Sequence, residues 1–295
     1  MTTEVLTPPA PPRRSAVRRA VGLVLRLWPF WALPALLVVY TGWVRTSAGG
    51  ASGDAFHGTV SPAAAAKVRA DGRFRVGIYN IQGAVGKQDP AILKRIAETV
   101  AQTDVCGLTE VRGNSYSADR RNQAQMLGEE IGHAWLFAPS ERRFWRDSNG
   151  NGVVARVPVG PWARLPLPDT GEPGTFRNVV LMTATLGGKP VRVLVAHADR
   201  GPARADQMRA IGEVFASVQA PAVLLADLNG DPFDPLLKHV MSAPGAADVI
   251  SDRIGAKDKR VDWIVTRGLK VVDAGRVEDG SSDHAFFWAD LELEP

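Results

Sequence analysis

Cysteine is almost absent from this chain of 295 residues, because Cys106 is the only one. A single thiol excludes an internal disulfide. Cys106 lies in an apolar, strand-like run, which predicts an inert core residue. Apolar residues make up 45% of the chain, a share that is normal for a folded protein, and the length allows one large core or two small ones.

Excess charge is also lacking outside the N-terminal segment. Residues 1–45 contain six arginines and one acid, which gives +5, whereas the whole chain carries +4. Residues 46–295 therefore sum to −1. Bulk charge gives no support to nucleic-acid binding by that part of the chain, although local basic patches are compatible with it.

Long uncharged apolar runs are scarce, and the one that stands out covers 18 residues from Leu27 to Val44. Its length reaches the threshold for crossing a bilayer, and Pro29 and Pro34 are tolerated in such helices. We therefore predict a basic cytoplasmic tail over 1–20 and a transmembrane anchor over 21–45, with the lipid bilayer as its partner. The arginine flank should stay in the cytoplasm, which makes this a single-pass protein of the cell membrane with its folded domain on the extracytoplasmic side. A cleaved signal peptide and a buried soluble helix are the alternatives.

After the anchor, Ala, Gly and Ser dominate residues 46–72, which we interpret as a flexible linker. Strand and helix patterns alternate over 73–295 without an internal repeat. Helices are expected over 90–102, 118–131 and 203–218, and strands over 74–81, 104–108, 153–155, 179–186, 191–196, 222–225, 261–265 and 285–293. Gly187-Gly188 predicts a tight hairpin turn between two of these strands. The pattern predicts one α+β domain in which two sheets pack face to face with helices outside.

Polar residues stand at or just after several of the apolar strand patterns. They are Asn80, Glu110, His197, Asp227, Asn229, Asp262, Ser282, Asp283 and His284. Strand ends project side chains into one common pocket, and oxygen ligands with histidine suit a hard divalent cation and a phosphate ester together. Each residue taken singly is also compatible with an ordinary turn or cap, so the prediction of a site depends on the whole set.

Asp262 has a further reason to be functional, because it lies within an otherwise apolar strand pattern. Burying a carboxylate without a partner is costly, so we expect Asp262 to form a hydrogen bond, for which His284 is a good candidate. A carboxylate–imidazole pair fixes the tautomer of the histidine and raises its basicity.

In order and spacing, these residues resemble the endonuclease/exonuclease/phosphatase superfamily. The resemblance covers about residues 73–295, and the pair of motifs Asp227-Leu228-Asn229 and Ser282-Asp283-His284 carries most of its specificity. It implies a four-layer α/β/β/α sandwich and a hydrolase that uses Mg²⁺, with Mn²⁺ or Ca²⁺ as alternatives, in the attack of water on phosphorus. It further implies that Glu110 holds the metal, with Asn80 and Asp283 assisting.

The remaining residues receive catalytic roles from the same resemblance. Asp227 and Asn229 would align the water and the phosphate. Asp262 would orient His284. The two histidines, His197 and His284, would stabilise charge on the phosphoryl oxygens or transfer the proton.

The leading hypothesis is therefore a membrane-anchored, metal-dependent phosphoesterase that cleaves a phosphodiester or phosphomonoester. A lipid or sugar phosphate agrees with the anchor and with the aromatic pair Phe144-Trp145, for which core packing is the alternative. DNA, cut by an extracellular endonuclease, agrees with Arg142, Arg143 and Arg146 around that pair. A non-catalytic binding module of the same fold predicts loss of a metal or proton-transfer group, and none is missing. No protein partner is expected.

Overall fold

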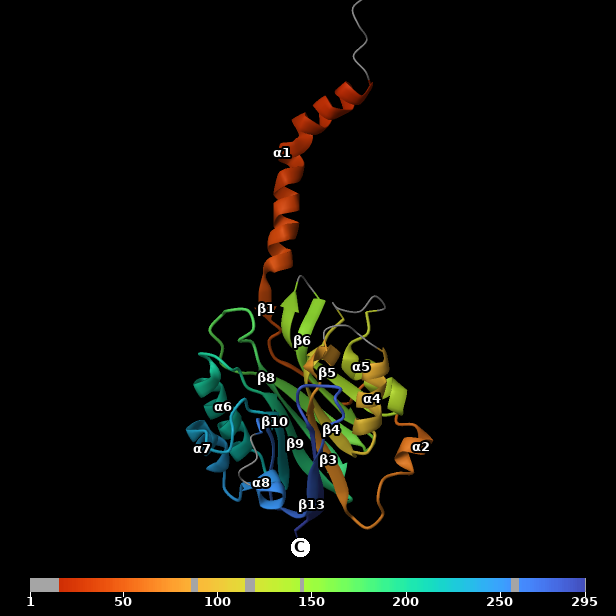
Figure 1. Cartoon of the computed structure of the whole chain (residues 1–295), viewed down its shortest axis with the longest axis vertical. Coiled ribbons are helices and arrows are strands. Elements are labelled where there is room, and N and C mark those ends of the chain that lie inside the picture. Colours follow the sequence, from red (N-terminus) through yellow and green to blue (C-terminus); the bar gives the residue numbers. More distant parts are fainter. Residues whose placement is uncertain (1–15, 86–89, 115–119, 144–145, 256–259, 295) are drawn as a thin grey trace, which may run out of the picture. The chain divides into compact units, whose positions relative to one another are not determined.

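The computed structural model describes residues 16–85, 90–114, 120–143, 146–255 and 260–294 (Figure 1). The chain divides into two units, Met1–Val44 and Arg45–Pro295. Helix α1 (Ala16–Trp43) belongs to the first unit and contains two prolines. Within the described residues, no helix combines the length and the apolar character needed to cross a bilayer. The prediction of a spanning anchor over 21–45 therefore gains no support from the structure.

Two mixed sheets, each of seven strands, form the second unit. The first sheet has the order β1 (Arg45–Ser47), β5 (Ala134–Arg143), β6 (Arg146–Ala155), β4 (Val105–Arg112), β3 (Phe74–Asn80), β14 (Phe286–Leu293) and β13 (Leu269–Val277). The second has the order β11 (Ala247–Asp248), β12 (Asp262–Arg267), β10 (Ala222–Asp227), β9 (Lys189–His197), β8 (Asn178–Leu186), β7 (Val159–Pro166) and β2 (Ala51–Gly53). The pairs β3/β4 and β9/β10 are parallel and central, and the other pairs are antiparallel.

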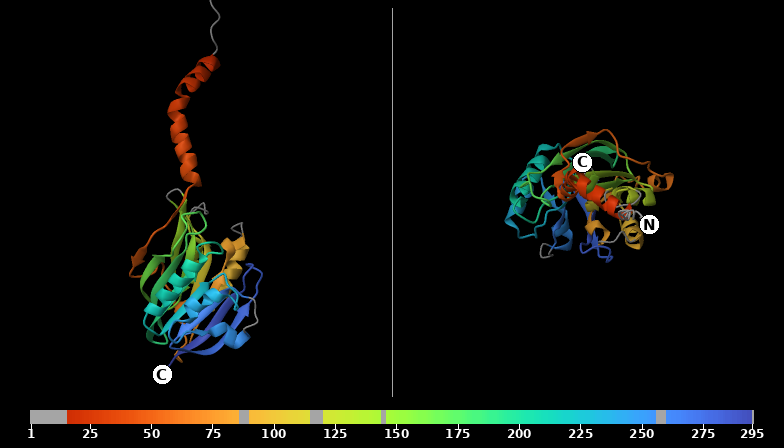
Figure 2. Two further views of the ribbon diagram at one scale, coloured as in Figure 1. Left: turned by 90° about the vertical axis from the view of Figure 1, so that its left-hand side faces the viewer. Right: turned by 90° about the horizontal axis from the view of Figure 1, so that it is seen from above.

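Helices cover the outer face of each sheet, as Figure 2 shows. Residues of α4 (Pro90–Val100) and α5 (Gln123–Ile131) share one buried cluster with β3 and β4, while α6 (Arg204–Ser217) and α7 (Lys238–Met241) share another with β9 and β10. A third cluster fills the space between the sheets, where alternate strand residues such as Val76, Val105, Val195 and Leu225 meet. The predicted α+β sandwich of two packed sheets flanked by helices is confirmed. Short helices α2 (Pro62–Ala65), α3 (Gln82–Val85), η1 (Pro235–Leu237) and α8 (Val249–Ile254) complete the unit.

Elements with strong internal periodicity lie where the sequence places them. Helix α4 buries Leu93, Ile96 and Val100, which share one side at helical spacing, against the sheet. Strands β8 and β9 form the expected hairpin, in which Gly187 and Gly188 have φ of 55° and 78°, a region that favours glycine.

The predicted linker over 46–72 is wrong in its first part. Residues 45–53 begin with a strand of the first sheet and end with a strand of the second. We call this segment the N-terminal strap. Its strand β1 pairs with β5 and its strand β2 pairs with β7, so one short segment covers an edge of each sheet. Arg164 donates hydrogen bonds from Nε to the carbonyl of Gly49 at 2.8 Å and from Nη2 to that of Ala48 at 2.9 Å. The folded unit therefore begins at Arg45, about 28 residues earlier than predicted.

Candidate active site

The central strands of the two sheets carry polar residues at neighbouring ends. In the first sheet, Asn80 ends β3, and Glu110 lies near the end of the parallel strand β4. In the second, His197 ends β9 beside Asp227, which ends β10. Strand β12 runs antiparallel to β10, and its first residue, Asp262, pairs with Asp227. The packing of the two sheets brings these ends to one place, where the contacts described below join them.

Asn80 connects the two sheets within the site. It is fully buried, and its Nδ2 donates hydrogen bonds to Oδ2 of Asp227 at 2.8 Å and to Oε1 of Glu110 at 3.2 Å. Its Oδ1 accepts from the backbone N–H of Gln82 at 2.9 Å. Asn80 thus presents donors to the two carboxylates and holds them near one another.

Glu110 owes its orientation to an irregularity in β4. The pairing of β4 with β6 shifts between Leu108 and Val111, and Glu110 has φ of 54°. Such a bulge turns a strand residue away from its regular direction. A left-handed conformation is unfavourable for a residue with a Cβ, by about 1–3 kcal/mol, so the surrounding structure must impose it.

Asp262 and His284 form the hydrogen-bonded pair that the sequence predicts. His284 Nδ1 lies 2.6 Å from Oδ2 of Asp262, and both side chains are largely buried. Burial raises the pKa of Asp262 to about 7. Burial also lowers the pKa of His284, but the hydrogen bond and negative charge of Asp262 outweigh that effect and raise it to about 9. The pairing with Asp262 therefore favours the charged form of the imidazole.

His197 has the opposite character. Burial lowers its pKa to about 4, although the charge of Asp227 acts in the other direction. Its Nε2 lies 3.4 Å from Oδ2 of Asp227 and 3.2 Å from Nδ2 of Asn229. Asn229 has φ of 49°, which asparagine tolerates, and its backbone N–H donates to Oδ1 of Asp227 at 3.0 Å. The pKa values of the two histidines of the site are thus shifted in opposite directions.

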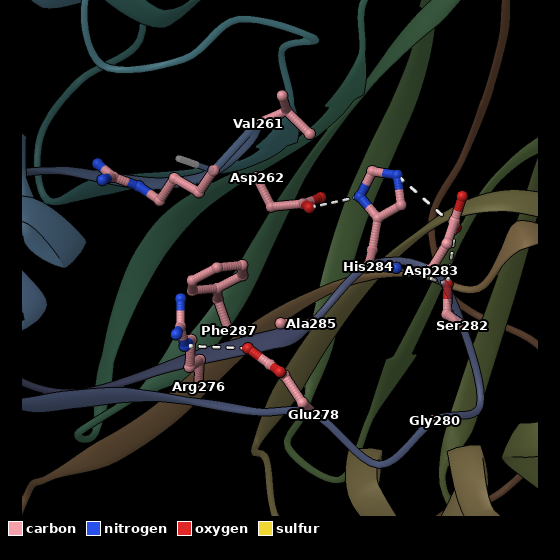
Figure 3. A pocket seen from close by; sticks show the side chains of 11 residues that line it. Val261, Asp262, Arg276, Glu278, Gly280, Ser282, Asp283, His284, Ala285 and Phe287 are labelled. Carbon is pink, nitrogen blue, oxygen red and sulfur yellow. Dashed lines mark hydrogen bonds and ion pairs between the residues drawn. The ribbon is translucent and has the colours of Figure 1, made fainter. Parts of the chain in front are cut away.

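A pocket of about 590 Å³ opens beside His284 (Figure 3). It is lined by Arg260, Val261, Asp262, Arg276, Glu278, Gly280, Ser282, Asp283, His284, Ala285 and Phe287. Figure 3 shows the paired Asp262 and His284 on one wall and the ion pair of Arg276 with Glu278, 3.3 Å, on another. A substrate in this pocket would lie against the imidazole of His284.

Oxygen atoms suited to a hard cation gather at the same place. Ligand atoms of Asp227, Asp262 and His284 all lie within 4.8 Å of one another. Oδ1 of Asp262 is buried and has no hydrogen-bond partner in the described part of the chain, which leaves it available to a cation. The residues present therefore fit Mg²⁺, Mn²⁺ or Ca²⁺, whose ligands are carboxylate and carbonyl oxygens.

The sequence model of the Endonuclease/Exonuclease/phosphatase family matches residues 77–284, more than half of the chain and every residue of the site. The chain belongs to this family. Its members are hydrolases that act on phosphoester bonds. No protein with a curated description matches the sequence.

Solved structures of family members share the fold. An endonuclease/exonuclease/phosphatase from Beutenbergia cavernae DSM 12333 superposes with a TM-score of 0.61 at 24% identity, covering 75% of this chain and 72% of that one. The human Nocturnin catalytic domain with bound sulfate gives 0.59 at 17% identity, covering 75% and 93%. TDP2 from D. rerio, complexed with a single-strand DNA product, gives 0.60 at 15% identity, covering 75% and 99%. At these identities the likeness concerns the fold alone.

All eight residues predicted for this family member's site lie in one network of contacts. They are Asn80, Glu110, His197, Asp227, Asn229, Asp262, Asp283 and His284. Asp283 is the most peripheral, since its side chain is 53% exposed and lies 4.0 Å from Nε2 of His284. Ligand atoms of Asp227, Asp262 and His284 converge most tightly, and Asn80 joins Glu110 to Asp227 beside them. The assignment of Glu110, Asn80 and Asp283 as metal ligands stays a prediction.

Two residues of the site were not predicted. Gln82 donates from Nε2 to Oδ2 of Asp283 at 2.9 Å, and Arg200 donates from Nε to Oδ1 of Asn229 at 2.8 Å. The available signal was position in sequence, since each follows a predicted site residue by two or three places. The aromatic pair Phe144-Trp145 lies outside the described residues.

Proposed function

We propose that this protein hydrolyses a phosphodiester or phosphomonoester by attack of water on phosphorus, with a divalent cation as cofactor. The observation that carries the proposal is the convergence of carboxylates and two histidines, contributed by both sheets, beside the pocket that Asp262 and His284 line. Family membership supports the same reaction class. The neighbour TDP2 bears a DNA strand, which supports nucleic acid among the candidate substrates.

Each residue of the site has a distinct role in the proposed hydrolysis. Asp227 is placed to accept a proton from the attacking water, because Asn80 and the backbone of Asn229 hold both of its oxygens in position. The charged imidazole of His284 stabilises negative charge on a phosphoryl oxygen or donates a proton to it, and Asp262 fixes its orientation. His197 and Asn229, which contact each other, position the phosphate by hydrogen bonding.

The cation, when bound, supplies electrostatic stabilisation of the charge that develops on phosphorus oxygens. Glu110 is proposed as its principal protein ligand, with Asp283 and Asn80 assisting. The free Oδ1 of Asp262 extends this donor set toward the pocket. Mg²⁺ is the expected ion, and Mn²⁺ or Ca²⁺ would also suit oxygen ligands.

Hydrolysis of bis-p-nitrophenyl phosphate by the purified full chain tests the proposal. Activity should require Mg²⁺ or Mn²⁺, vanish with EDTA and return when the metal is restored. Glu110→Gln should raise the metal concentration for half-maximal activity about tenfold, because one charged ligand is lost. Lack of activity with any divalent ion, in a protein that binds nucleic acid or another ligand, would favour the non-catalytic module instead.

The cellular location is a separate proposal, which the N-terminal sequence alone supports. We propose a single-pass protein attached to the cell membrane, with the folded unit on the extracytoplasmic side, because an arginine-rich flank precedes a charge-free apolar stretch. Alkaline carbonate extraction of membranes and protease treatment of intact cells would test it. Release of the protein by carbonate would overturn membrane attachment.

A further inference from the structure

Arg200 extends the site along the surface next to β9. It lies in the loop after His197, is exposed, and uses only Nε to bind Oδ1 of Asn229 at 2.8 Å. Neither Nη1 nor Nη2 has a hydrogen-bond or ion-pair partner among the residues that the structure describes. The guanidinium is thus fixed at one nitrogen by a residue of the site, while its other two nitrogens are open to an anion.

Phe233 presents an exposed aromatic ring in the turn that follows Asn229. Phe233 is 75% exposed, and Val68, at 42%, is the only other exposed large apolar residue in the described part of the folded unit. Phe233 follows Asn229 by four residues, so their Cα atoms lie within roughly 14 Å of one another. Arg200 lies in the loop after β9 and Phe233 in the turn after β10, and the ion pair of Arg204 with Asp234 joins these two segments.

The turn that carries Phe233 is well fixed by hydrogen bonds. Asp231 Oδ1 accepts from the N–H of Phe233 at 2.9 Å, and the carbonyl of Asp231 accepts from the N–H of Asp234 at 3.0 Å. The carboxylate of Asp234 pairs with Arg204, and Trp263 Nε1 donates to the carbonyl of Gly230 at 3.0 Å. An exposed ring on a rigid turn loses little conformational entropy when a flat ligand stacks on it.

We propose that Arg200 and Phe233 bind the nucleotide that adjoins the scissile phosphate of a single-stranded nucleic acid, Arg200 through a phosphate and Phe233 by stacking on a base. This inference rests on the proposed function and narrows its substrate class. Aromatic rings and arginines along a strand path are the usual elements of sequence-independent single-strand binding. Because Arg200 contacts Asn229 and Phe233 follows Asn229 by four residues, the bound nucleotide would lie next to the reacting phosphate.

A lipid substrate fits this part of the surface less well. Insertion into a bilayer surface requires a contiguous apolar area, whereas Phe233 stands among Asp231, Pro232 and Asp234.

The test compares a short single-stranded oligonucleotide with bis-p-nitrophenyl phosphate, a diester that has no flanking nucleotide. For Phe233→Ala and Arg200→Ala, the ratio of kcat/KM on the oligonucleotide to kcat/KM on the small diester should each fall about tenfold, the loss of one stacked base or one phosphate contact. Phe233→Trp should keep the ratio, because an aromatic face remains. Arg209→Ala is the matched control, since Arg209 is an exposed arginine on α6 paired with Asp206.

Binding without turnover separates this inference from the proposed function. Fluorescence anisotropy of the labelled oligonucleotide in EDTA should show weaker binding for both alanine variants, and for Arg200→Ala a salt dependence reduced by about one counterion. Equal losses on both substrates, or unchanged anisotropy, would overturn the inference even if the enzyme is active. Loss of binding to sphingomyelin vesicles rather than to the oligonucleotide would overturn it in favour of a lipid surface. An inactive wild type would refute the proposed function while the anisotropy result still decides the inference.

Discussion

Asp262 is the residue whose burial is hardest to justify by stability alone. It is almost fully buried, only one of its oxygens is paired, and its pKa is raised to about 7 by desolvation. A buried carboxylate with an unpaired oxygen is typical of functional positions, where the rest of the fold offsets the free energy lost by desolvation. The pair with His284 therefore indicates chemistry rather than structural support.

Asp262→Asn should separate these two contributions. The amide keeps the shape but removes the charge that holds His284 protonated, so kcat should fall by about 10²–10⁴-fold, as for loss of an orienting carboxylate. The melting temperature should stay the same or rise, because a desolvated carboxylate is removed. Steady-state kinetics and thermal unfolding on one preparation measure both. A variant with normal kcat would show that the pair is structural.

His133 is a buried titratable residue away from the site. Burial lowers its pKa from 6.5 to about 4, with smaller contributions from the charges of Arg156 and Lys67. A depressed histidine pKa means that the unfolded state binds a proton more readily, so stability is complete above pH 6.5 and is lost as pH falls toward 4. The loss should approach about 3 kcal/mol. Urea unfolding of His133→Phe at pH 4.5 and 7 should show a smaller difference than the wild type, and an equal difference would contradict this origin.

At the level of elements, the sequence predicts helices and strands that have their own hydrophobic periodicity. It does not predict short strands that form only by pairing with distant parts of the chain. Helix α4 and the β8–β9 hairpin carry their own periodicity and turn glycines, so both are predictable. The two strands of the strap have three residues each, without alternation of apolar and polar residues. Ser47, for example, is paired with Glu141 of β5, which is far away in the sequence. Nonlocal pairing of this kind leaves no pattern in the short segment itself.

The same distinction holds for the site. Chemically distinctive residues at strand ends, such as Asp227 and His284, are predictable because their type and position both point to function. The bulge that turns Glu110, and the hydrogen bond that adds Arg200, depend on β6 and on Asn229 respectively. Strand β6 is distant from Glu110 in the sequence, and Asn229 is distant from Arg200. A local stretch of sequence therefore cannot predict either contact.

The loop between β13 and β14, which carries Asp283 and His284, is held by Asp279. Its carboxylate accepts hydrogen bonds from Tyr79 Oη at 2.8 Å, from Thr99 Oγ1 at 2.7 Å and from the N–H of Ser281 at 2.8 Å. These bonds attach the loop to β3 and α4 and so fix the approach of His284 to Asp262.

Asp279→Ala should therefore lower activity, although we do not expect Asp279 itself to contact the substrate. We expect kcat to fall about tenfold and stability to fall by about 1–3 kcal/mol, because three donors lose their acceptor. Asp273→Ala is the control, since Asp273 is an exposed acid of β13 that accepts only from its neighbour Ala274. Unchanged kcat in the Asp279 variant would show that the loop is positioned by other contacts.

At the level of the whole molecule, activity depends on the spacing between the two sheets. Asn80 and Glu110 come from one sheet, His197 and Asp227 from the other, and the pair Asp262–His284 joins them. Gly107 in β4 lies where the two sheets are in close contact, since an added Cβ would meet Val195 at 3.0 Å and Leu225 at 3.2 Å.

Gly107→Ala should force the sheets apart close to the site. Overpacking of this kind costs about 1–3 kcal/mol of stability, and kcat should fall with it because residues of the two sheets separate. Gly160→Ala in β7 is the matched control, because the nearest atoms to its added Cβ lie 3.8 Å away. A loss of stability without any loss of activity would show that the site tolerates movement between the sheets.

The N-terminal strap has a consequence for the order of folding. Its residues leave the ribosome before every other part of the folded unit, yet the strands that they pair with end only at Arg143 and Pro166. Loop closure across about 100 residues is slow, because the chain loses conformational entropy before the contacts between the paired strands form. We therefore expect the strap to dock late, so that the two sheet edges that it covers stay exposed until the strands of both sheets have formed.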